Sequence, residues 1–454
     1  MKNSPLTNRT FLTFNTCNSF GNTKAIIGIL KLFIFLFFLT LNTTVLKALP
    51  SYARQLGMSC TACHYSFPEL TSFGRQFKLN GYTMTGMQTI QVKSDSDQVT
   101  RLNLLSSLPL SVMVQSSFTS ISKKIEDVQN NSVAFPQQLS MFYAGQVTPH
   151  IGTFIQVTYD GQSFGIDNAD IRYANHASIG SKNMIYGFTL NNNPTVQDVW
   201  NTIPAWRFPS ASPEAGNSPA KSPLIENLGM QVAGLGAYAQ FNSLFFAELT
   251  FYRSAQQGAA NPSDVTNTMV IKNLAPYWRL ALQHEWSKNY LELGAFGLSS
   301  KQFVNGISGE MDNFTDAGID LQYERHLNKG TFTLHSSYIY ESESRVLTNT
   351  NAVKLDFDSF KIDGNLYFAN GFGATIGYFN STGSEDEDVV GSLTNKPNSN
   401  GYIFQLEYLP WYNTKFSIQY VMYNKFDGSI NNYDGMGRNA ANNNSLYILA
   451  WINF

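Results

Sequence analysis

Two cysteines and one histidine lie within five consecutive residues, Cys60-Thr61-Ala62-Cys63-His64. A Cys-x-x-Cys-His sequence is the attachment signature of a c-type haem, in which both thiols form thioether bonds and the histidine ligates the iron. One alternative is a Cys-x-x-Cys redox or disulfide motif that happens to precede a histidine. The sequence therefore predicts one covalently bound haem c, with Cys60 and Cys63 as its attachment points and His64 as the proximal iron ligand.

A zinc site is a weaker alternative for the same residues. Structural zinc takes four ligands, commonly cysteines and histidines. The chain has three cysteines, and the third, Cys17, lies upstream of a hydrophobic leader. A four-ligand cluster of cysteines and nearby histidines is therefore not expected here.

The leader is a hydrophobic stretch at residues 32–41 that follows Lys24 and Lys31. Its length of about ten residues fits the apolar region of a secretory signal peptide rather than a membrane span. We expect residues 1–48 to be a signal peptide, with cleavage after Ala48. Haem is attached to Cys-x-x-Cys-His motifs after export, so the leader agrees with the motif.

Beyond residue 48 the sequence favours a membrane β-barrel. It has no run of about 18 apolar residues, which argues against a transmembrane helix. Aromatic residues make up 14% of the chain and charged residues only 14%. Apolar and polar residues alternate with period two at 402–408 and at 416–423, and a short turn at 409–414 joins these two predicted strands.

Segments of this kind number about sixteen between residue 108 and the C-terminus, an even number, as single-chain outer-membrane barrels require. Short turns alternate with longer polar loops, which is the asymmetry of periplasmic turns and outward loops. A closing strand is expected at residues 445–454, and a soluble all-β sandwich or propeller is the alternative fold. The long loops are expected near residues 122–136, 192–229, 254–275, 300–313, 383–399 and 426–444.

The predicted fold class is therefore mainly β. It is an antiparallel outer-membrane barrel of about sixteen strands at residues 101–454, preceded by a small α-helical monohaem cytochrome c module at residues 49–100. A module of this size needs a covalent or oligomeric support, which a haem would supply. A barrel of this size leaves an aqueous lumen, and we expect the module to occupy it as a plug.

The region around the motif resembles the fused cytochrome-porin family of outer-membrane iron oxidases. That resemblance implies a signal peptide, one N-terminal haem c and a porin-like barrel of about sixteen strands. It also implies that Cys60 and Cys63 attach the haem and that His64 is its proximal ligand. The segment 192–202, in the longest expected loop, also looks like a family feature. The resemblance around the motif is carried by residues 53–55, 57–64, 67–70, 73–78 and 81–82.

A second iron ligand must come from a lone residue, because the chain has one haem motif. Met84 and Met87 are the nearest downstream candidates, and a thioether ligand would raise the haem potential. The alternative for either methionine is a core-filling side chain. Arg54 and Arg75 are candidates to pair with the haem propionates, or else solvated charges.

Strand parity places several charged residues on the polar face, which predicts a lumen with an acidic excess that favours cations. A run of four acidic residues at 385–388 in an expected outward loop could concentrate divalent metal ions, although a solvated loop is the alternative. The residues expected on the lumen face are Glu248, Glu285, Glu292, Asp320, Glu324, Glu407 and Arg279.

These features together predict electron transfer across the outer membrane. An extracellular reductant, with Fe(II) as the candidate, would donate electrons to the haem, and a periplasmic cytochrome would accept them. Fe(II) oxidase activity is the candidate enzymatic role. One alternative is a porin whose haem module gates or plugs the lumen, and another is catalysis at an open haem site. The net charge of -2 gives no reason to expect a nucleic-acid partner.

Overall fold

The computed structural model describes residues 50–84, 89–93, 100–105, 107–159, 161–200, 218–229, 231–255, 264–266, 269–346 and 352–454. The predicted signal peptide, Cys17 and Met87 lie outside these residues. The residues from Leu49 to Phe454 form one compact unit.

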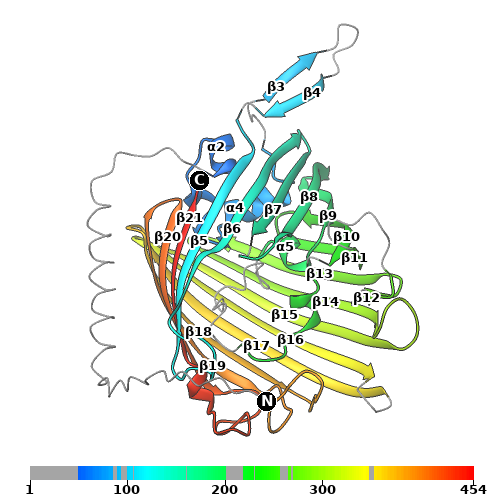
Figure 1. Cartoon of the computed structure of the whole chain (residues 1–454). Helices are drawn as coiled ribbons and strands as arrows, with labels where there is room; N and C mark the ends of the chain where they lie inside the picture. The colour runs from blue at the N-terminus through cyan, green and yellow to red at the C-terminus, as the bar shows by residue number, and fades with distance from the viewer. Residues whose placement is uncertain are drawn as a thin grey trace, which may run out of the picture. The chain divides into compact units, whose positions relative to one another are not determined.

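Sixteen long antiparallel strands and the short strand β12 (Val270–Ile271) make a closed barrel, which confirms the predicted strand number. The long strands follow each other around the barrel in sequence order, and the last one pairs with the first (Figure 1). The barrel strands begin at Leu110 rather than near residue 101. The long strands are β5 (Leu110–Ile121), β6 (Ser132–Thr148), β7 (Ile151–Tyr159), β8 (Phe164–Ile179), β9 (Lys182–Asn191), β10 (Val232–Phe241), β11 (Phe245–Ser254), β13 (Ala275–Trp286), β14 (Asn289–Phe303), β15 (Met311–Leu327), β16 (Gly330–Val346), β17 (Ala352–Phe368), β18 (Phe372–Gly383), β19 (Ser399–Trp411), β20 (Thr414–Lys425) and β21 (Ser445–Asn453).

Connections at the two ends of the barrel differ in length, as the sequence predicts. One end carries tight turns, such as the one between β10 and β11, where Asn242 and Ser243 both have φ of 53°. Polar residues tolerate that left-handed backbone, which short hairpin turns require. The six predicted long loops all fall at the other end, and two further connections at 160–163 and 347–351 join them.

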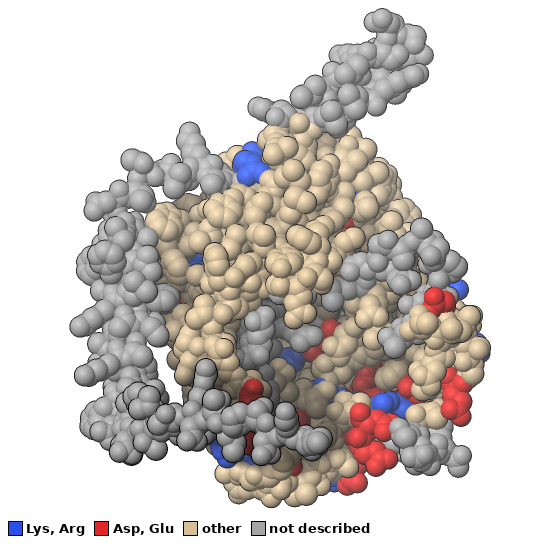
Figure 2. Space-filling view, viewed as in Figure 1, with Lys and Arg blue, Asp and Glu red and all other residues tan. Residues whose placement is uncertain are grey.

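Side chains alternate between the lumen and the outside along each strand. On β5, buried and half-buried residues alternate from Leu110 to Ile121. On β10, Leu235 points outward and is 64% exposed, whereas its neighbours Gly234 and Gly236 are buried. Figure 2 shows a strand wall that is mostly uncharged, with charged side chains gathered at the lower right of the view. The outer wall therefore has the apolar surface that a lipid-facing barrel needs.

Residues 50–84, which we call the N-terminal segment, fold into three short helices and a two-stranded ladder. The left-handed residue Gly57 (φ 65°) ends α2, and the Thr71 side chain caps α4 by accepting a hydrogen bond from the Gly74 backbone N–H. None of the helices that the structure describes is long and apolar enough to cross a membrane. These elements are α2 (Ser51–Leu56), α3 (Cys60–Cys63), β1 (His64–Ser66), β2 (Glu69–Leu70) and α4 (Ser72–Leu79).

Other short elements connect this framework. A hairpin of β3 (Thr89–Lys93) and β4 (Thr100–Leu105) separates the N-terminal segment from the barrel. The loop after β9 holds α5 (Pro194–Gln197) and α6 (Leu224–Asn227), and η2 (Ala440–Asn443) precedes β21.

The N-terminal segment packs against lumen-facing side chains and backbone. Ser51 of α2 donates a hydrogen bond to the carbonyl of Ala144 on β6 (2.5 Å), and Tyr238 of β10 donates one to the carbonyl of Leu79 in α4 (2.7 Å). Both Ala144 and Tyr238 are buried. Figure 1 shows α2 and α4 beside β5, β6 and β21. The N-terminal segment therefore lies in the lumen.

The outward face of the barrel can be tested with a pair of arginine substitutions. Leu280 lies at the middle of β13 and is 45% exposed, so Leu280→Arg should lower the free energy of unfolding by about 2–4 kcal/mol, because a charge in hydrocarbon loses its hydration. Leu274 lies just before β13, near the end of the barrel. The substitution Leu274→Arg should lower the free energy of unfolding by only about 0–1 kcal/mol, because a charge near the membrane interface stays hydrated. Urea unfolding from lipid vesicles measures both, and equal losses would contradict a lipid-facing β13.

Candidate functional site

The three residues of the haem motif lie together on one short helix and the residue after it. Cys60 and Cys63 are the first and last residues of α3, and His64 begins β1. Residues three apart in a helix share a face, so the two thiols lie on one side of α3. Both cysteines are free thiols in the structure, Cys60 buried and Cys63 half-buried.

The helix α4 packs closely on α3 and holds it in place. A Cβ atom at Gly74 would overlap the carbonyl oxygen of Cys63, so this approach depends on glycine. The Thr71 hydroxyl donates to the carbonyl of Ala62 (2.6 Å), and the Thr71 N–H donates to the carbonyl of Cys63 (2.9 Å). Thr71, the N-cap residue of α4, thus supplies hydrogen-bond donors to both carbonyl groups at the end of α3.

The protonation states at the motif suit ligation better than thiol redox chemistry. Burial raises the pKa of Cys60 and that of Cys63 to about 11, whereas a reactive Cys-x-x-Cys pair needs a lowered thiol pKa. Desolvation lowers the pKa of His64 to about 4, against the effect of backbone hydrogen bonds with Pro68 and Glu69. At neutral pH the imidazole is therefore neutral, which is the form that ligates a metal.

An apolar cavity of about 190 Å³ surrounds the motif. The N-terminal segment supplies one side of it, and the strands β5, β6, β7 and β21 supply another. Thr195 and Val196, from the loop after β9, also line it. The cavity is therefore assembled from four separate parts of the chain. Aromatic and aliphatic side chains that face it include Phe67, Phe77, Met113, Phe142, Phe154 and Trp451.

The barrel wall facing this cavity is apolar, although the interiors of water-filled barrels are polar. We call five of these wall residues, listed at the end of this paragraph, the apolar lumen patch. All five are buried and packed in one cluster with Cys60 and Phe67. Other lumen positions on the same strands carry Ser117, Thr119 and Ser140. Apolar lumen residues also occur elsewhere, where Tyr252, Phe296 and Leu298 pack against α6 of the inward-folded loop after β9. The patch consists of Met113, Phe142, Ala144, Leu449 and Trp451.

Buried ion pairs and hydrogen bonds attach the N-terminal segment to the lumen wall. Arg75 of α4 pairs with Glu324 of β15 (2.5 Å), and Tyr65 donates a hydrogen bond to the same carboxylate (2.7 Å). Tyr82 donates to Asp170 of β8 (2.7 Å). Arg75 is therefore a buried, paired cation and not a solvated charge, and its pairing with a haem propionate stays a prediction.

A second set of polar contacts lies around Glu69. Tyr367 of β17 donates a hydrogen bond to Glu69 (2.5 Å), and His335 of β16 lies 3.5 Å from it. Lys415 of β20 donates to the carbonyl of Phe67 (2.6 Å). Three strands of the barrel, β16, β17 and β20, thus hold the turn that follows His64.

The loop after β9 folds inward and contacts the N-terminal segment. Lys78 of α4 donates to the carbonyl of Asp198 (2.9 Å), and burial lowers the pKa of this lysine to about 8. Trp200 packs in a buried cluster with Leu79 and donates to the hydroxyl of Tyr290 (2.7 Å). Residues 192–200, the described part of the segment 192–202 that looks like a family feature, therefore reach the candidate site.

Of the two predicted second ligands, the structure describes only Met84. Met84 is half-buried, but it is not among the described residues that line the cavity, and Met87 lies outside the described residues. Met113, which sequence reasoning missed, does line it. Arg54 donates hydrogen bonds to the carbonyls of Leu108 (3.3 Å) and Leu110.

Most of the predicted lumen carboxylates are in the lumen but already have cationic partners. Arg279 contacts Glu292 (3.0 Å) and Asp320 (2.5 Å), and Arg75 contacts Glu324. Glu248 and Glu407 are also buried, whereas Glu285, near the turn end of β13, is exposed. Such pairing reduces the acidic excess that the sequence predicts.

The acidic run at 385–388 is also partly paired. Asp386 is fully buried and contacts Lys221 (3.2 Å) and Arg345 (2.6 Å). Glu385 lies 3.5 Å from Lys396. Over the described residues, no group of three or more His, Cys, Asp or Glu side chains is arranged to hold a metal ion.

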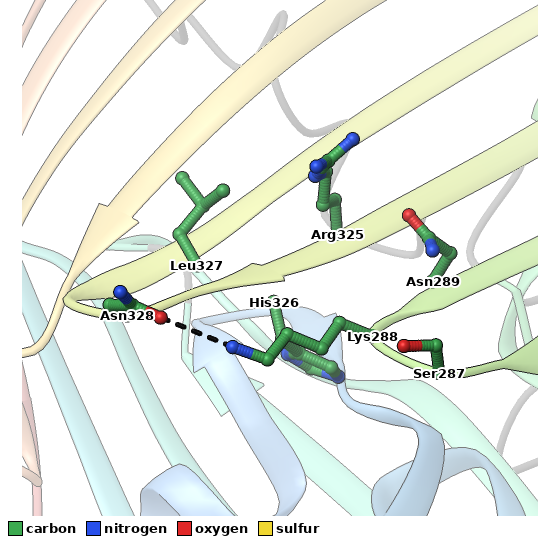
Figure 3. Close-up of a pocket in the computed structure, with 7 residues that line it drawn as sticks. All are labelled: Ser287, Lys288, Asn289, Arg325, His326, Leu327 and Asn328. Atoms are coloured by element: carbon green, nitrogen blue, oxygen red, sulfur yellow. Dashed lines mark hydrogen bonds between the residues drawn. The ribbon is translucent and has the colours of Figure 1, made fainter.

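A separate hollow of about 350 Å³ lies at the turn end of β13 to β16 (Figure 3). Lys288 reaches across it to donate a hydrogen bond to Asn328 (3.1 Å), and Arg325 points away from that pair. Its side chains are exposed and polar for the most part. It holds neither cysteine, so the cavity around the motif remains the candidate site.

Three proteins of known structure are among those similar to this chain. The outer membrane channel DcaP of Acinetobacter baumannii is 11% identical over 76% of this chain and 96% of its own, with a TM-score of 0.45. OmpT of Vibrio cholerae is 10% identical over 80% of this chain and 100% of its own (TM-score 0.44). An anion-selective porin of Comamonas acidovorans is 9% identical over 76% of this chain and 98% of its own (TM-score 0.45). No family model and no curated protein sequence matches the chain, and the structural likeness does not extend to function.

The Arg75–Glu324 pair gives a test of how the N-terminal segment is held. Arg75→Met leaves a buried carboxylate without its cation, which should cost roughly 3–5 kcal/mol and loosen the segment. We expect trypsin to cleave within the segment faster while the barrel stays folded. The double variant Arg75→Met/Glu324→Met removes both charges and should regain most of the protection. A single variant as resistant as the unchanged protein would contradict this anchoring role.

Proposed function

We propose that this chain is an outer-membrane electron-transfer protein in which Cys60 and Cys63 attach one haem c and His64 ligates its iron. Electrons would pass from an extracellular donor, with Fe(II) as the candidate, to a periplasmic acceptor such as a cytochrome. The observation that carries the proposal is the apolar lumen patch beside the motif. The patch and the N-terminal segment leave a cavity with both thiols and the imidazole on its wall, where an apolar porphyrin face could lie.

The side chains at the cavity fit a haem c. Its porphyrin has large apolar faces, which Phe67, Phe142 and Trp451 can cover, and its attachment consumes two free thiols. When bound, it supplies a one-electron redox centre. The chain's own residues would anchor it through Cys60 and Cys63, ligate it through the neutral His64, and exclude water from it.

The position of the cavity along the barrel also suits this function. Met113 lies near the start of β5 and Trp451 near the end of β21, so the cavity is in the half of the lumen next to the short turns. In outer-membrane barrels the short turns face the periplasm. A periplasmic acceptor could therefore approach the cavity more closely than an extracellular donor. The exposed apolar outer wall supports the membrane location.

A channel is the second candidate function. A closed barrel of this size encloses a lumen wide enough for water, and the many polar side chains on its inner wall support solute passage. The N-terminal segment and the loop after β9 would then act as a gate. Ion conductance in planar bilayers that rises when the Arg75–Glu324 pair is broken would favour this function.

Covalent haem attachment can be tested directly. The full-length protein, exported in a host that attaches haem to such motifs, should keep haem peroxidase stain on a denaturing gel. The double variant Cys60→Ser/Cys63→Ser should lose the stain, because no thioether bond can form. Cys17→Ser, in the predicted leader, is the matched control and should keep it. An unstained wild-type protein would remove haem from the proposal.

The donor can be tested on the same haem-loaded protein in detergent. Anaerobic addition of Fe(II) should convert the haem absorbance to the reduced spectrum, because a high haem potential lets iron transfer its electron. Dithionite serves as the control that defines complete reduction. Reduction by dithionite but not by Fe(II) would keep haem and barrel and exclude iron as the donor.

A further inference from the structure

The cavity around the motif is lined by several side chains with an atom that could ligate iron. The proposed haem already has His64 on one side, so a second ligand would have to come from this set. Besides His64, the described candidates are Tyr52, Met58, Lys78, Tyr82 and Met113.

Three of these candidates have their polar atoms committed to the barrel or to its loop. The Tyr52 hydroxyl donates to the carbonyl of Thr153, and the Tyr82 hydroxyl donates to Asp170 (2.7 Å). The Lys78 ammonium group donates to the carbonyl of Asp198 (2.9 Å) and is buried there. Ligation by any of them would break a buried hydrogen bond, which is costly.

The two remaining candidates are methionines in different settings. Met58 lies two residues before Cys60 and is 36% exposed, so its side chain is only partly at the cavity. Met113 is completely buried on β5 and packs in the same cluster as Cys60 and Trp451. Of the described candidates, only Met113 presents a sulfur atom from the barrel wall.

Met113 also departs from the pattern of its own strand. The other lumen-facing residues of β5 between residues 111 and 119 are all polar. The Met113 sulfur accepts one weak hydrogen bond, from Gln115 (3.5 Å), and a thioether sulfur has a second lone pair. That contact orients the sulfur and leaves it able to donate to a metal. The polar residues concerned are Ser111, Gln115, Ser117 and Thr119.

We infer that Met113 supplies the second axial ligand of the haem iron, so that a barrel strand completes a site that the N-terminal segment begins. The sulfur donates a lone pair to the iron, and no atom or electron is otherwise exchanged. This inference rests on the proposed function. A histidine and methionine pair raises the haem potential, which suits a weak donor such as Fe(II).

The test uses the haem-loaded, full-length protein in detergent. Met113→Leu removes the sulfur while nearly preserving side-chain volume. We expect it to keep the haem stain but lose the low-spin ferric spectrum, bind added imidazole readily, and have a lower midpoint potential. Met58→Leu is the matched control and should keep the low-spin spectrum and the potential of the unchanged protein. Met113→His should restore a low-spin spectrum at a potential below that of the unchanged protein.

A measurement on the unchanged protein does not depend on whether the variants fold. The near-infrared magnetic circular dichroism of the ferric haem distinguishes a histidine and methionine pair from two nitrogen ligands. Two nitrogen ligands in the unchanged protein, a high-spin haem in the unchanged protein, or a methionine signature that persists in Met113→Leu would each overturn the inference. All three outcomes presuppose attached haem, so they differ from an unstained protein, which would overturn the proposed function instead.

Discussion

The structure depends on the pairing of its last strand with its first. Hydrogen bonds between β21 and β5 close the sheet, and a closed sheet leaves no unpaired backbone edge in lipid. The same pairing sets side by side two stretches that are more than 300 residues apart in the sequence, with Asn453 opposite Met113. It thereby brings Trp451 and Leu449 next to Met113. The apolar lumen patch exists because the barrel closes in this register.

The N-terminal segment depends on that barrel in turn. Its helices span six, four and eight residues, which is too short for helices to be stable alone in water. Buried contacts with the lumen wall supply what helix propensity does not. A buried pair such as Arg75 with Glu324 adds little net stability, but leaving either charge alone is costly, so the pair fixes one position of α4. Hydrogen bonds from Tyr367 to Glu69 and from Tyr82 to Asp170 fix the middle and the end of the segment.

Sequence reasoning predicts the local features of this molecule and misses the long-range ones. Strand number, turns and long loops follow from period-two alternation, and the helical turn of Cys60 to Cys63 is a local feature. Strand parity also predicts that Glu324 faces the lumen, but not that Arg75 meets it, because nothing local links residues 249 positions apart. Nearness in sequence favours Met84, which is not among the described residues that line the cavity. The sequence does show that Met113 interrupts a series of polar residues on the lumen face of β5. Its role could not be inferred from that alone, because the sequence does not show which part of the N-terminal segment lies against β5.

If the proposed function holds, the way the cavity is assembled explains why the haem would be attached covalently. Its walls come from the N-terminal segment, from β5 to β7, from β21 and from the loop after β9. Before β21 pairs with β5, Met113 and Trp451 are not neighbours, and a haem held only by packing would have no enclosed site. Thioether bonds to Cys60 and Cys63 need no such wall, so they can hold the haem on the exported chain until closure. The wall then adds what the bonds alone cannot, an apolar enclosure and a sulfur atom at one fixed place in the lumen.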